Sequence, residues 1–252
     1  MEKPNSFFKT LTNLDKEKLF YRVLPRFFLE IIKKYLRLEV VGIENIPKKG
    51  AVLVAPNHSG FSGFDAIIIN YIIQQKARRL AKVMTHHLWF LTETTSIPAE
   101  KLGFVEATFD HGVELLKKKN LIVLFPEGEN GNFKPSSKMY QLQEFKRGFV
   151  RMALATGAPI VPCLVIGAEE THINLSQLRL TKFLRGPIIP LPLNIIPLPA
   201  KWKICFLEPI TLPYSKESAN DSELVHELAE EIQEKMQKEL LLEVRKRKSV
   251  FF

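Results

Sequence analysis

The chain has 252 residues, a formal net charge of +9 at pH 7 and 46% hydrophobic residues. This length is enough for one large domain or two small ones, and the composition is that of a globular protein, which excludes disorder over most of the chain. The positive charge favours anionic partners such as anionic lipid or a phosphorylated substrate. The sequence contains no zinc-finger spacing, RNA-recognition motif or basic leucine zipper, so no nucleic-acid partner is expected.

The first 37 residues mix aromatic and basic side chains, and we predict one or two helices that are broken near Pro25. Such a segment can lie in a lipid interface, with its apolar face in the membrane and its cations at the headgroups. The alternative is a helical hairpin that packs on the rest of the protein. Aromatic residues of this segment are Phe7, Phe8, Phe20, Tyr21, Phe27, Phe28 and Tyr35.

Residues 38–213 alternate between strand-like and helix-like patterns, which predicts one α/β domain with a largely parallel mixed sheet flanked by helices. The expected helix at 109–118 has Asp110 as its N-terminal cap, and the one at 145–156 ends at Gly157. A third helix is expected at 65–74, and strands at 38–43, 51–55, 80–84, 102–107, 121–125, 159–166 and 203–207.

The late part of the chain holds a proline-rich stretch and then a long amphipathic pattern. Residues 186–200 are apolar but interrupted by prolines, so they cannot form a regular helix and are expected to be a loop. Residues 214–252 are predicted to form a C-terminal amphipathic helix with a basic tail. The apolar residues that recur every four positions are Leu224, Leu228, Ile232, Met236 and Leu240.

The cellular setting follows from the cysteines and from the apolar runs. Cys163 and Cys205 each lie in an apolar strand-like run, so we expect buried thiols in a reducing compartment rather than a disulfide. The polar start of the chain does not resemble a signal peptide. No run reaches the ~18 apolar residues of a spanning helix. These features predict a peripheral protein on the cytoplasmic side of a membrane.

His58 and Asp65 follow an apolar run and are therefore expected at the carboxyl edge of the sheet, where ligands of open α/β proteins bind. An imidazole can take a proton from a hydroxyl, and a carboxylate on its other nitrogen fixes the tautomer. Seven residues of straight helix rise about 10 Å, so the pair can meet only if the chain loops back, which Gly60 and Gly63 permit. The alternative is that Asp65 simply caps the following helix.

A second segment, Phe125-Pro126-Glu127-Gly128, follows the apolar run 121–125 and is expected at the same edge. It could form a tight turn beside the histidine, although Pro-Glu-Gly is also common in ordinary loops. Backbone N–H groups near these glycine turns could hold a developing oxyanion.

Three further features have ordinary interpretations beside functional ones. The segment around Ser62 misses a nucleophile elbow, because Phe64 occupies the position of its final glycine. His86 and His87 have no partners at metal-ligand spacing, so a surface pair and no metal site are expected. Residues 169–172 either line the pocket at the sheet edge or form a solvated loop.

Together with Pro159-Ile160-Val161-Pro162, the two segments resemble the glycerolipid and lysophospholipid acyltransferase superfamily over residues 38–209. The resemblance implies an α/β domain behind a helical membrane anchor. It also implies acyl transfer to a glycerolipid hydroxyl, with acyl-CoA or acyl carrier protein as co-substrate and no other cofactor. By this likeness His58 is the general base and Asp65 its orienting partner. Substrate-binding candidates in the matching blocks are Asn57, Ser59, Phe125 and Pro126, with Glu127 and Gly128 on the acceptor side.

The chain departs from the family pattern in three places. Six residues separate His58 from Asp65 where the family has four, which we interpret as a longer loop. Glu129-Asn130 replaces the usual Thr-Arg, and the middle block at 102–108 lacks its arginine. These changes argue against lysophosphatidate as acceptor and favour another lysophospholipid or a neutral acceptor. Cations that could replace the lost phosphate contacts, or be surface charges, are Lys134, Lys138, Lys146 and Arg147.

The predicted function is therefore an O-acyltransferase whose partners are an acyl donor, a glycerolipid acceptor and an anionic membrane surface. Two alternatives are a catalytically idle lipid-binding protein on the same fold, and a lipase or thioesterase that uses Ser62 or Cys163.

Overall fold

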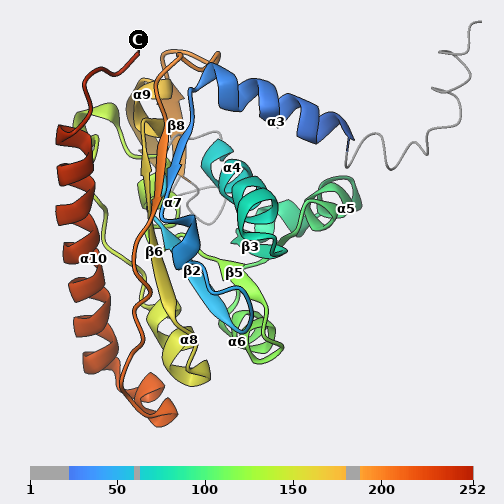
Figure 1. Ribbon diagram of the computed structural model, residues 1–252, viewed down its shortest axis with the longest axis vertical. Coiled ribbons are helices and arrows are strands. Elements are labelled where there is room, and N and C mark those ends of the chain that lie inside the picture. The colour runs from blue at the N-terminus through green and yellow to red at the C-terminus, as the bar shows by residue number, and fades with distance from the viewer. Residues whose placement is uncertain (1–22, 60–62, 180–187, 252) are drawn as a thin grey trace, which may run out of the picture.

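The computed structural model describes residues 23–59, 63–179 and 188–251, and its centre is a seven-stranded sheet in the order β1-β9-β6-β2-β5-β3-β4 (Figure 1). Strand β2 is buried along its whole length, as a continuous apolar run in a central parallel strand should be. The strands of this sheet are β1 (Glu39–Val41), β2 (Val52–Pro56), β3 (Ala81–Thr85), β4 (Phe104–Glu106), β5 (Leu121–Val123), β6 (Ile160–Ile166) and β9 (Lys203–Phe206).

The sheet is mostly parallel, which confirms the predicted α/β class. Strands β6, β2, β5, β3 and β4 are parallel to one another. Strand β9 is antiparallel to β6, and β1 is parallel to β9, so these two run against the other five. The carboxyl ends of β2 and β5 lie at one edge, because the two strands pair directly.

Helices cover both faces of the sheet (Figure 1). Residues of α6, α8 and α10 pack into the core of one face, and residues of α3 and α4 pack into the core of the other. The helices are α3 (Leu24–Tyr35), α4 (Phe64–Ile72), α5 (Glu93–Lys101), α6 (Phe109–Lys117), α7 (Glu129–Asn132), α8 (Gly148–Thr156), α9 (Ala168–Thr171) and α10 (Ser222–Arg245).

Several local predictions are corrected. Thr108, not Asp110, caps α6, since the Thr108 hydroxyl accepts a hydrogen bond from the N–H of His111. Helix α8 ends at Gly157 as expected but begins only at Gly148. Helix α5 was not predicted, because its polar sequence has no apolar periodicity.

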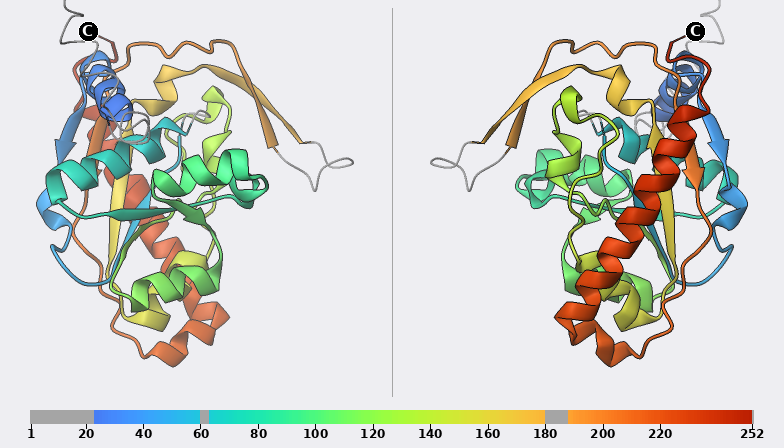
Figure 2. Two further views of the ribbon diagram at one scale, coloured as in Figure 1. Left: turned by 90° about the vertical axis from the view of Figure 1, so that its right-hand side faces the viewer. Right: turned by 90° about the vertical axis from the view of Figure 1, so that its left-hand side faces the viewer.

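The proline-rich stretch 186–200 is not entirely a loop. Strand β8 (Ile188–Pro192) pairs antiparallel with β7 (Asn174–Arg179), and this hairpin projects from the body of the protein (Figure 2). Two prolines are accommodated in β8 because a two-stranded hairpin leaves one side of each strand without ladder hydrogen bonds. The first residues of the stretch, 186 and 187, lie outside the described residues.

The predicted N-terminal segment is described only in part. Pro25 lies in the first turn of α3, so it starts a helix rather than breaking one. The aromatic residues Phe7, Phe8, Phe20 and Tyr21 lie outside the described residues. Among the helices that the structure describes, none is both long and apolar enough to cross a bilayer.

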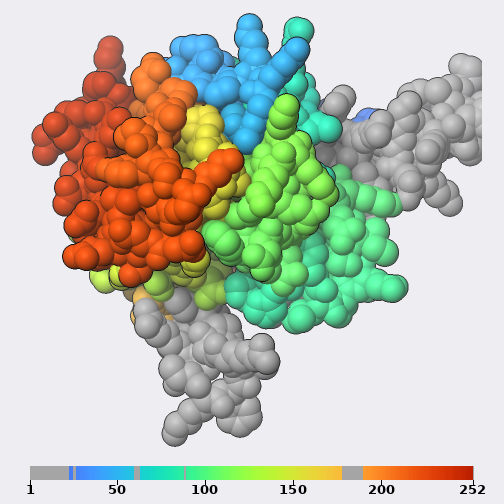
Figure 3. Space-filling view, turned by 90° about the horizontal axis from the view of Figure 1, so that it is seen from below, coloured from blue at the N-terminus to red at the C-terminus, as the bar shows by residue number. Residues whose placement is uncertain are grey.

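The amino ends of the parallel strands lie at the end of the molecule opposite the carboxyl edge of the sheet. In the view from below, segments distant in sequence form one continuous surface there: the turn before β2 in blue, α6 in green and residues 208–222 in orange (Figure 3). The carboxyl edge, which carries His58 and Glu127, therefore faces away from this surface.

Candidate active site

His58 and Asp65 are in direct contact. His58 Nδ1 lies 2.6 Å from Asp65 Oδ2, so the ring nitrogen donates to the carboxylate. In this tautomer Nε2 carries a free lone pair, which is the arrangement of a general base. The Asp65 side chain is fully buried, whereas the His58 side chain keeps 15% of its surface exposed. The six-residue spacing, two residues longer than the family's, therefore does not separate the pair.

Asp65 orients the histidine from the first turn of helix α4. Its Oδ2 also accepts from the N–H of Ser59 at 2.9 Å, and its Oδ1 accepts from the N–H of Ala66 at 2.8 Å. The N-cap of α4 is Gly63, with φ +69°, a conformation that L side chains rarely adopt. Asp65 is therefore not the helix cap that the sequence left as an alternative, and its carboxylate is the partner of His58.

Phe125 fixes the plane of the histidine ring. The two rings stack with their centroids 4.1 Å apart and an interplanar angle of 29°. Phe125 follows β5 directly and is buried. Its aromatic face therefore restricts the imidazole from the side of the second motif.

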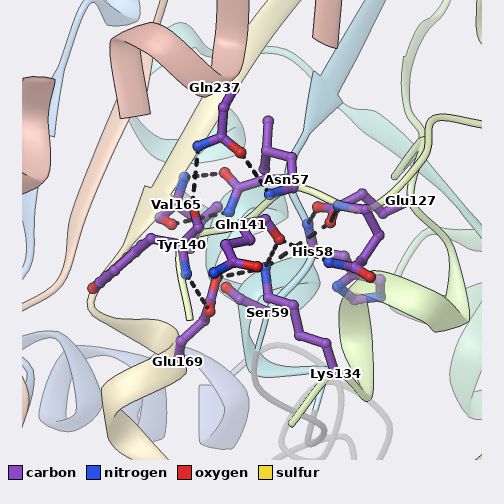
Figure 4. Close-up of polar contacts among 12 residues, drawn as sticks. Asn57, His58, Ser59, Glu127, Lys134, Tyr140, Gln141, Val165, Glu169 and Gln237 are labelled. Carbon is purple, nitrogen blue, oxygen red and sulfur yellow. Dashed lines mark hydrogen bonds and ion pairs between the residues drawn. The ribbon is translucent and has the colours of Figure 1, made fainter. Parts of the chain in front are cut away.

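Glu127 holds the main chain of the histidine rather than an open acceptor pocket. Its Oε1 accepts from the backbone N–H of His58 at 2.9 Å, and its Oε2 accepts from the N–H of Gln143 at 2.7 Å. The side chain is fully buried, and Figure 4 shows it beside His58. Gly131 packs against it so closely that a Cβ atom there would lie 2.6 Å from Glu127 Cβ. Glu127 thus positions the main chain of His58, the proposed base.

A buried lysine compensates the charge of Glu127. Lys134 Nζ lies 2.9 Å from Glu169 Oε1 and 4.0 Å from Glu127 Oε2, and it donates to the carbonyl of Gln141 at 3.1 Å. Burial raises the pKa of Glu127 and of Glu169, and the ammonium of Lys134 opposes that rise. One cation thus serves two carboxylates beneath the site (Figure 4).

Helix α10 supports this network from the other side. Gln237 Nε2 donates to the carbonyl of Tyr140 at 2.9 Å, and its Oε1 accepts from the N–H of Leu142 at 2.8 Å. Residues 140–143 are thereby held where Gln143 can donate to Glu127 (Figure 4). The amphipathic helix predicted at the C-terminus therefore does more than cover the sheet.

Asn57 ties the motif to the neighbouring strand. Its side chain is fully buried, donating to the carbonyl of Val165 at 3.1 Å and accepting from the N–H of Val165 at 2.7 Å. Because the buried amide presents no surface to a substrate, Asn57 supports the site and does not line it. Ser59 is buried as well, and its N–H is held by Asp65.

Three of the backbone N–H groups near the glycine turns are already engaged, and those of residues 60–62 lie outside the described residues. Those of His58 and Ser59 donate to Glu127 and Asp65, and that of Gly128 donates to the carbonyl of Phe125 at 3.1 Å. Within the part of the chain that the structure describes, these three groups do not point at a substrate.

The candidate cations lie in different places. Lys134 is buried, and Lys138 is exposed. Lys146 is exposed and leans over Gly128, since a Cβ atom on Gly128 would lie 2.8 Å from Lys146 Nζ. Its N–H donates to the carbonyl of Pro126 at 2.9 Å. Arg147 is exposed at the start of α8. Lys146 is thus the exposed candidate that the structure brings to the second motif, whereas Lys134 contacts Glu127 of that motif from a buried position.

His86 and His87 form the exposed pair that the sequence predicts, with ring centroids 4.1 Å apart, and His86 also belongs to this edge. It follows β3, and its Nε2 lies 3.2 Å from Glu129 Oε1. Burial lowers the pKa of His86. Its position after an apolar strand was the signal that could have placed it here. Within residues 23–59, 63–179 and 188–251, no three His, Cys, Asp or Glu side chains gather as metal ligands would.

The segment 169–172 is neither an open pocket lining nor a solvated loop. Glu169 is buried against Lys134, and Glu170 pairs with Arg247 at 2.7 Å. Thr171 accepts from Trp202 Nε1 at 2.7 Å. Cys163 is fully buried in β6, so it presents no nucleophile, and Ser62 lies outside the described residues.

Known proteins share this fold and sequence. An uncharacterized protein of Mycobacterium tuberculosis is 37% identical over 244 residues, covering 92% of this chain and 67% of that protein. The chain thus spans about two thirds of the length of this mycobacterial relative. The 1-acyl-sn-glycerol-3-phosphate acyltransferase of Saccharomyces cerevisiae is 29% identical over 163 residues, covering 61% of this chain and 52% of that protein.

The crystal structure of the 1-acyl-sn-glycerophosphate acyltransferase of Thermotoga maritima has the same fold. It matches with a TM-score of 0.57 and 19% sequence identity, and covers 96% of this chain and 88% of that chain. The model of the acyltransferase family matches residues 37–166, a range that holds His58, Asp65 and Glu127. The chain therefore belongs to the acyltransferase family.

Proposed function

We propose that the protein transfers a fatty acyl group from acyl-CoA or acyl carrier protein to a hydroxyl of a lysophospholipid or related glycerolipid. The observation that carries this proposal is the 2.6 Å contact of His58 with Asp65, supported from below by Glu127. Family membership supports the reaction class.

The geometry supports direct attack without a covalent acyl-enzyme. His58 Nε2 takes the proton of the acceptor hydroxyl while the hydroxyl oxygen bonds to the thioester carbonyl carbon. The carbon–sulfur bond then breaks, and the thiolate leaves with the proton from the imidazolium. Asp65 stabilises the imidazolium between these events. The buried Cys163 argues against a thioesterase that would use it as nucleophile.

The acceptor that fits best carries little negative charge near Gly128. Glu129, which stands in place of the family's threonine, brings a carboxylate paired with His86. Lys146 is the cation nearest to the turn. A carboxylate beside a single lysine favours a neutral glycerolipid or a zwitterionic lysophospholipid over a phosphomonoester.

The protein is proposed to work on the cytoplasmic side of a membrane, as a peripheral protein attached to anionic lipid. Helix α3 supports this, because Phe27, Phe28 and Ile31 are exposed on it and lysines lie in its last turn.

The test is transfer of labelled acyl chains to a panel of lysophospholipids and monoacylglycerol, with acyl-CoA and then acyl carrier protein as donor. Native protein should turn over at least one acceptor, and His58→Ala should abolish this without changing the unfolding midpoint. His226→Ala is the matched control, because His226 lies on α10 and pairs with Glu230. Full activity of His58→Ala would overturn the proposal. Acyl-chain binding without turnover on any acceptor would favour an idle lipid-binding protein.

A further inference from the structure

The loop after β8 has its apolar side chains outside and its polar groups inside. Leu193, Ile195 and Ile196 are 65%, 83% and 80% exposed, whereas Asn194 between them turns toward the protein. Large aliphatic side chains at such exposure are unusual in a loop that faces water. We call residues 191–199, the end of β8 and the loop that follows it, the proline loop.

Hydrogen bonds to the protein occupy several polar groups of the proline loop. Asn194 Oδ1 accepts from the N–H of Ile173 at 2.8 Å, and Asn194 Nδ2 donates to the carbonyls of Thr171 and Ile196 at 3.1 and 2.7 Å. The N–H groups of Leu193 and Leu198 donate to the carbonyls of Ile173 and Thr171. Prolines 192, 197 and 199 have no N–H to satisfy.

Exposed apolar side chains with polar groups bonded inward suit a lipid interface. Hydrocarbon offers no hydrogen bonds, so a segment that enters it must satisfy its polar groups internally. A protein partner would need a concave surface complementary to each protruding side chain, whereas acyl chains adapt to any apolar shape.

The proline loop is continuous with the apolar face of α3. The Tyr35 hydroxyl donates to the carbonyl of Pro197 at 2.7 Å, and the Arg37 guanidinium donates to that of Pro199. Both views in Figure 2 place α3 and this loop at the same end of the molecule. Positions 24, 27, 28, 31 and 35 follow helical spacing, and each carries an exposed large apolar side chain.

Charge at this end suits an anionic membrane. Lys34 and Arg37 are exposed where α3 meets the proline loop, and the whole chain carries a net charge of +9. Cations beside exposed aromatic and aliphatic side chains are the usual composition of a membrane-surface element.

We propose that the proline loop inserts into the lipid interface beside α3, so that two separate apolar elements hold the protein on an anionic bilayer. The loop joins β8 to β9, and its Leu198 is bonded to Thr171 just beyond the carboxyl end of β6. The sheet edge that carries His58 therefore lies next to the membrane. The inference does not depend on acyl transfer, because vesicle binding is measured without substrate.

The first test is sedimentation with vesicles of phosphatidylcholine and phosphatidylglycerol. The double variant Ile195→Glu/Ile196→Glu should lower the partition coefficient by about tenfold or more, since each change removes an inserting aliphatic side chain and adds an anion. The control is Leu80→Glu, because Leu80 is 73% exposed at the amino end of β3, away from the proposed membrane face. This control should bind as the native protein does, and all three proteins should share one unfolding midpoint.

A second measurement reads insertion directly. The tryptophan introduced by Ile195→Trp should shift its emission to the blue when vesicles are added, and brominated lipid should quench it. The tryptophan introduced by Leu80→Trp should show neither change. Unchanged partition of the glutamate variant, or an unquenched tryptophan at position 195, would overturn the proposal. A native dimer that the glutamate variant disperses, with vesicle binding unchanged, would also overturn it by assigning the loop to a second copy of the chain.

Discussion

Glu127 accepts a hydrogen bond from the backbone N–H of His58, although the two lie 69 positions apart in sequence. The carboxylate thus fixes the main chain of the proposed base while Asp65 fixes its ring. Two carboxylates that the motifs place side by side therefore act on different parts of the same residue. Substitutions of Glu127 and of Asp65 should therefore have different effects on stability and on activity.

Replacing Glu127 by glutamine should weaken the positioning of the His58 main chain while leaving the imidazole in place. The glutamine oxygen can accept from one of the two N–H groups, but its amide then faces the other donor, leaving one N–H of His58 or Gln143 unpaired. Such a loss costs about 1–3 kcal/mol of unfolding free energy. Because misplacement of a catalytic group is costly, kcat should fall by about tenfold to a hundredfold. Urea unfolding and acyl-transfer rates check both effects. The exposed Glu144→Gln is the control, and a Glu127→Gln protein indistinguishable from it would contradict the assignment.

Replacing Lys134 by methionine should destabilise the protein in a pH-dependent manner. Glu127 and Glu169 would lose their cation, and their pKa values, already raised by burial, should rise further. A carboxyl whose pKa is higher when folded binds more protons in the folded state, so the unfolding free energy falls as pH rises above its unfolded pKa. The unfolding free energy that Lys134→Met loses relative to native protein should therefore be smallest at about pH 5. It should reach about 3 kcal/mol or more near neutral pH.

Urea unfolding of the Lys134→Met and native proteins across this pH range measures that difference. The exposed Lys138→Met should differ from native protein by a small amount that does not change with pH. If the loss of unfolding free energy in Lys134→Met did not depend on pH, Lys134 would contribute packing but would not compensate the charges of Glu127 and Glu169.

Replacing Asp65 by asparagine should slow catalysis far more than it changes binding of the acceptor. Asparagine retains the shape but not the charge that stabilises the imidazolium, and its amide can select the wrong tautomer. We expect kcat to fall by about 10²–10⁴ with a smaller change in KM. Asp110→Asn is a close control, because Asp110 is also the second residue of a helix and follows a phenylalanine. Equal rates for the two variants would remove Asp65 from the mechanism.

Gly131→Ala tests how tightly Glu127 is held. An added Cβ would lie 2.6 Å from Glu127 Cβ and 2.9 Å from its Oε2, so the carboxylate must shift. Overpacking of this kind costs about 1–3 kcal/mol. Gly148→Ala, in α8, meets nothing within 4 Å and should be neutral or stabilising by up to about 1 kcal/mol. Thermal unfolding of the pair gives the comparison, and a stable, fully active Gly131→Ala would show that Glu127 tolerates displacement.

The two thiols should be unreactive in the folded protein. Register pairs Cys163 with Phe206 and Leu164 with Cys205, so the cysteines point to opposite faces of the sheet and cannot form a disulfide. Burial raises the pKa of Cys163, and that of Cys205 to about 12. A disulfide-exchange reagent near about pH 8 should label neither thiol until the chain unfolds. Denaturant without reductant should then release both thiols. Rapid labelling of the native protein would contradict this burial.

The sequence predicted the fold class and the edge that carries the site because both follow from short-range patterns. The apolar runs before His58 and Glu127 are buried parallel strands, and their ends lie together. It could not predict that Glu127 bonds the His58 N–H, or that Lys134 pairs with Glu169, since those contacts depend on three-dimensional register. The direction of β9 and the hairpin β7–β8 were missed for the same reason. The contact of His86 with Glu129 was missed because a histidine pair has no short-range pattern that names its partner.

The network beneath His58 also bears on how the protein becomes active during synthesis. Its contributors include Glu169 and, through residues 140–143, Gln237 on α10. A chain still emerging from the ribosome lacks this support until α10 has been synthesised and has folded. The histidine motif is made early but is supported only after α10 is in place, so the onset of catalytic competence could serve as a reporter of the docking of α10.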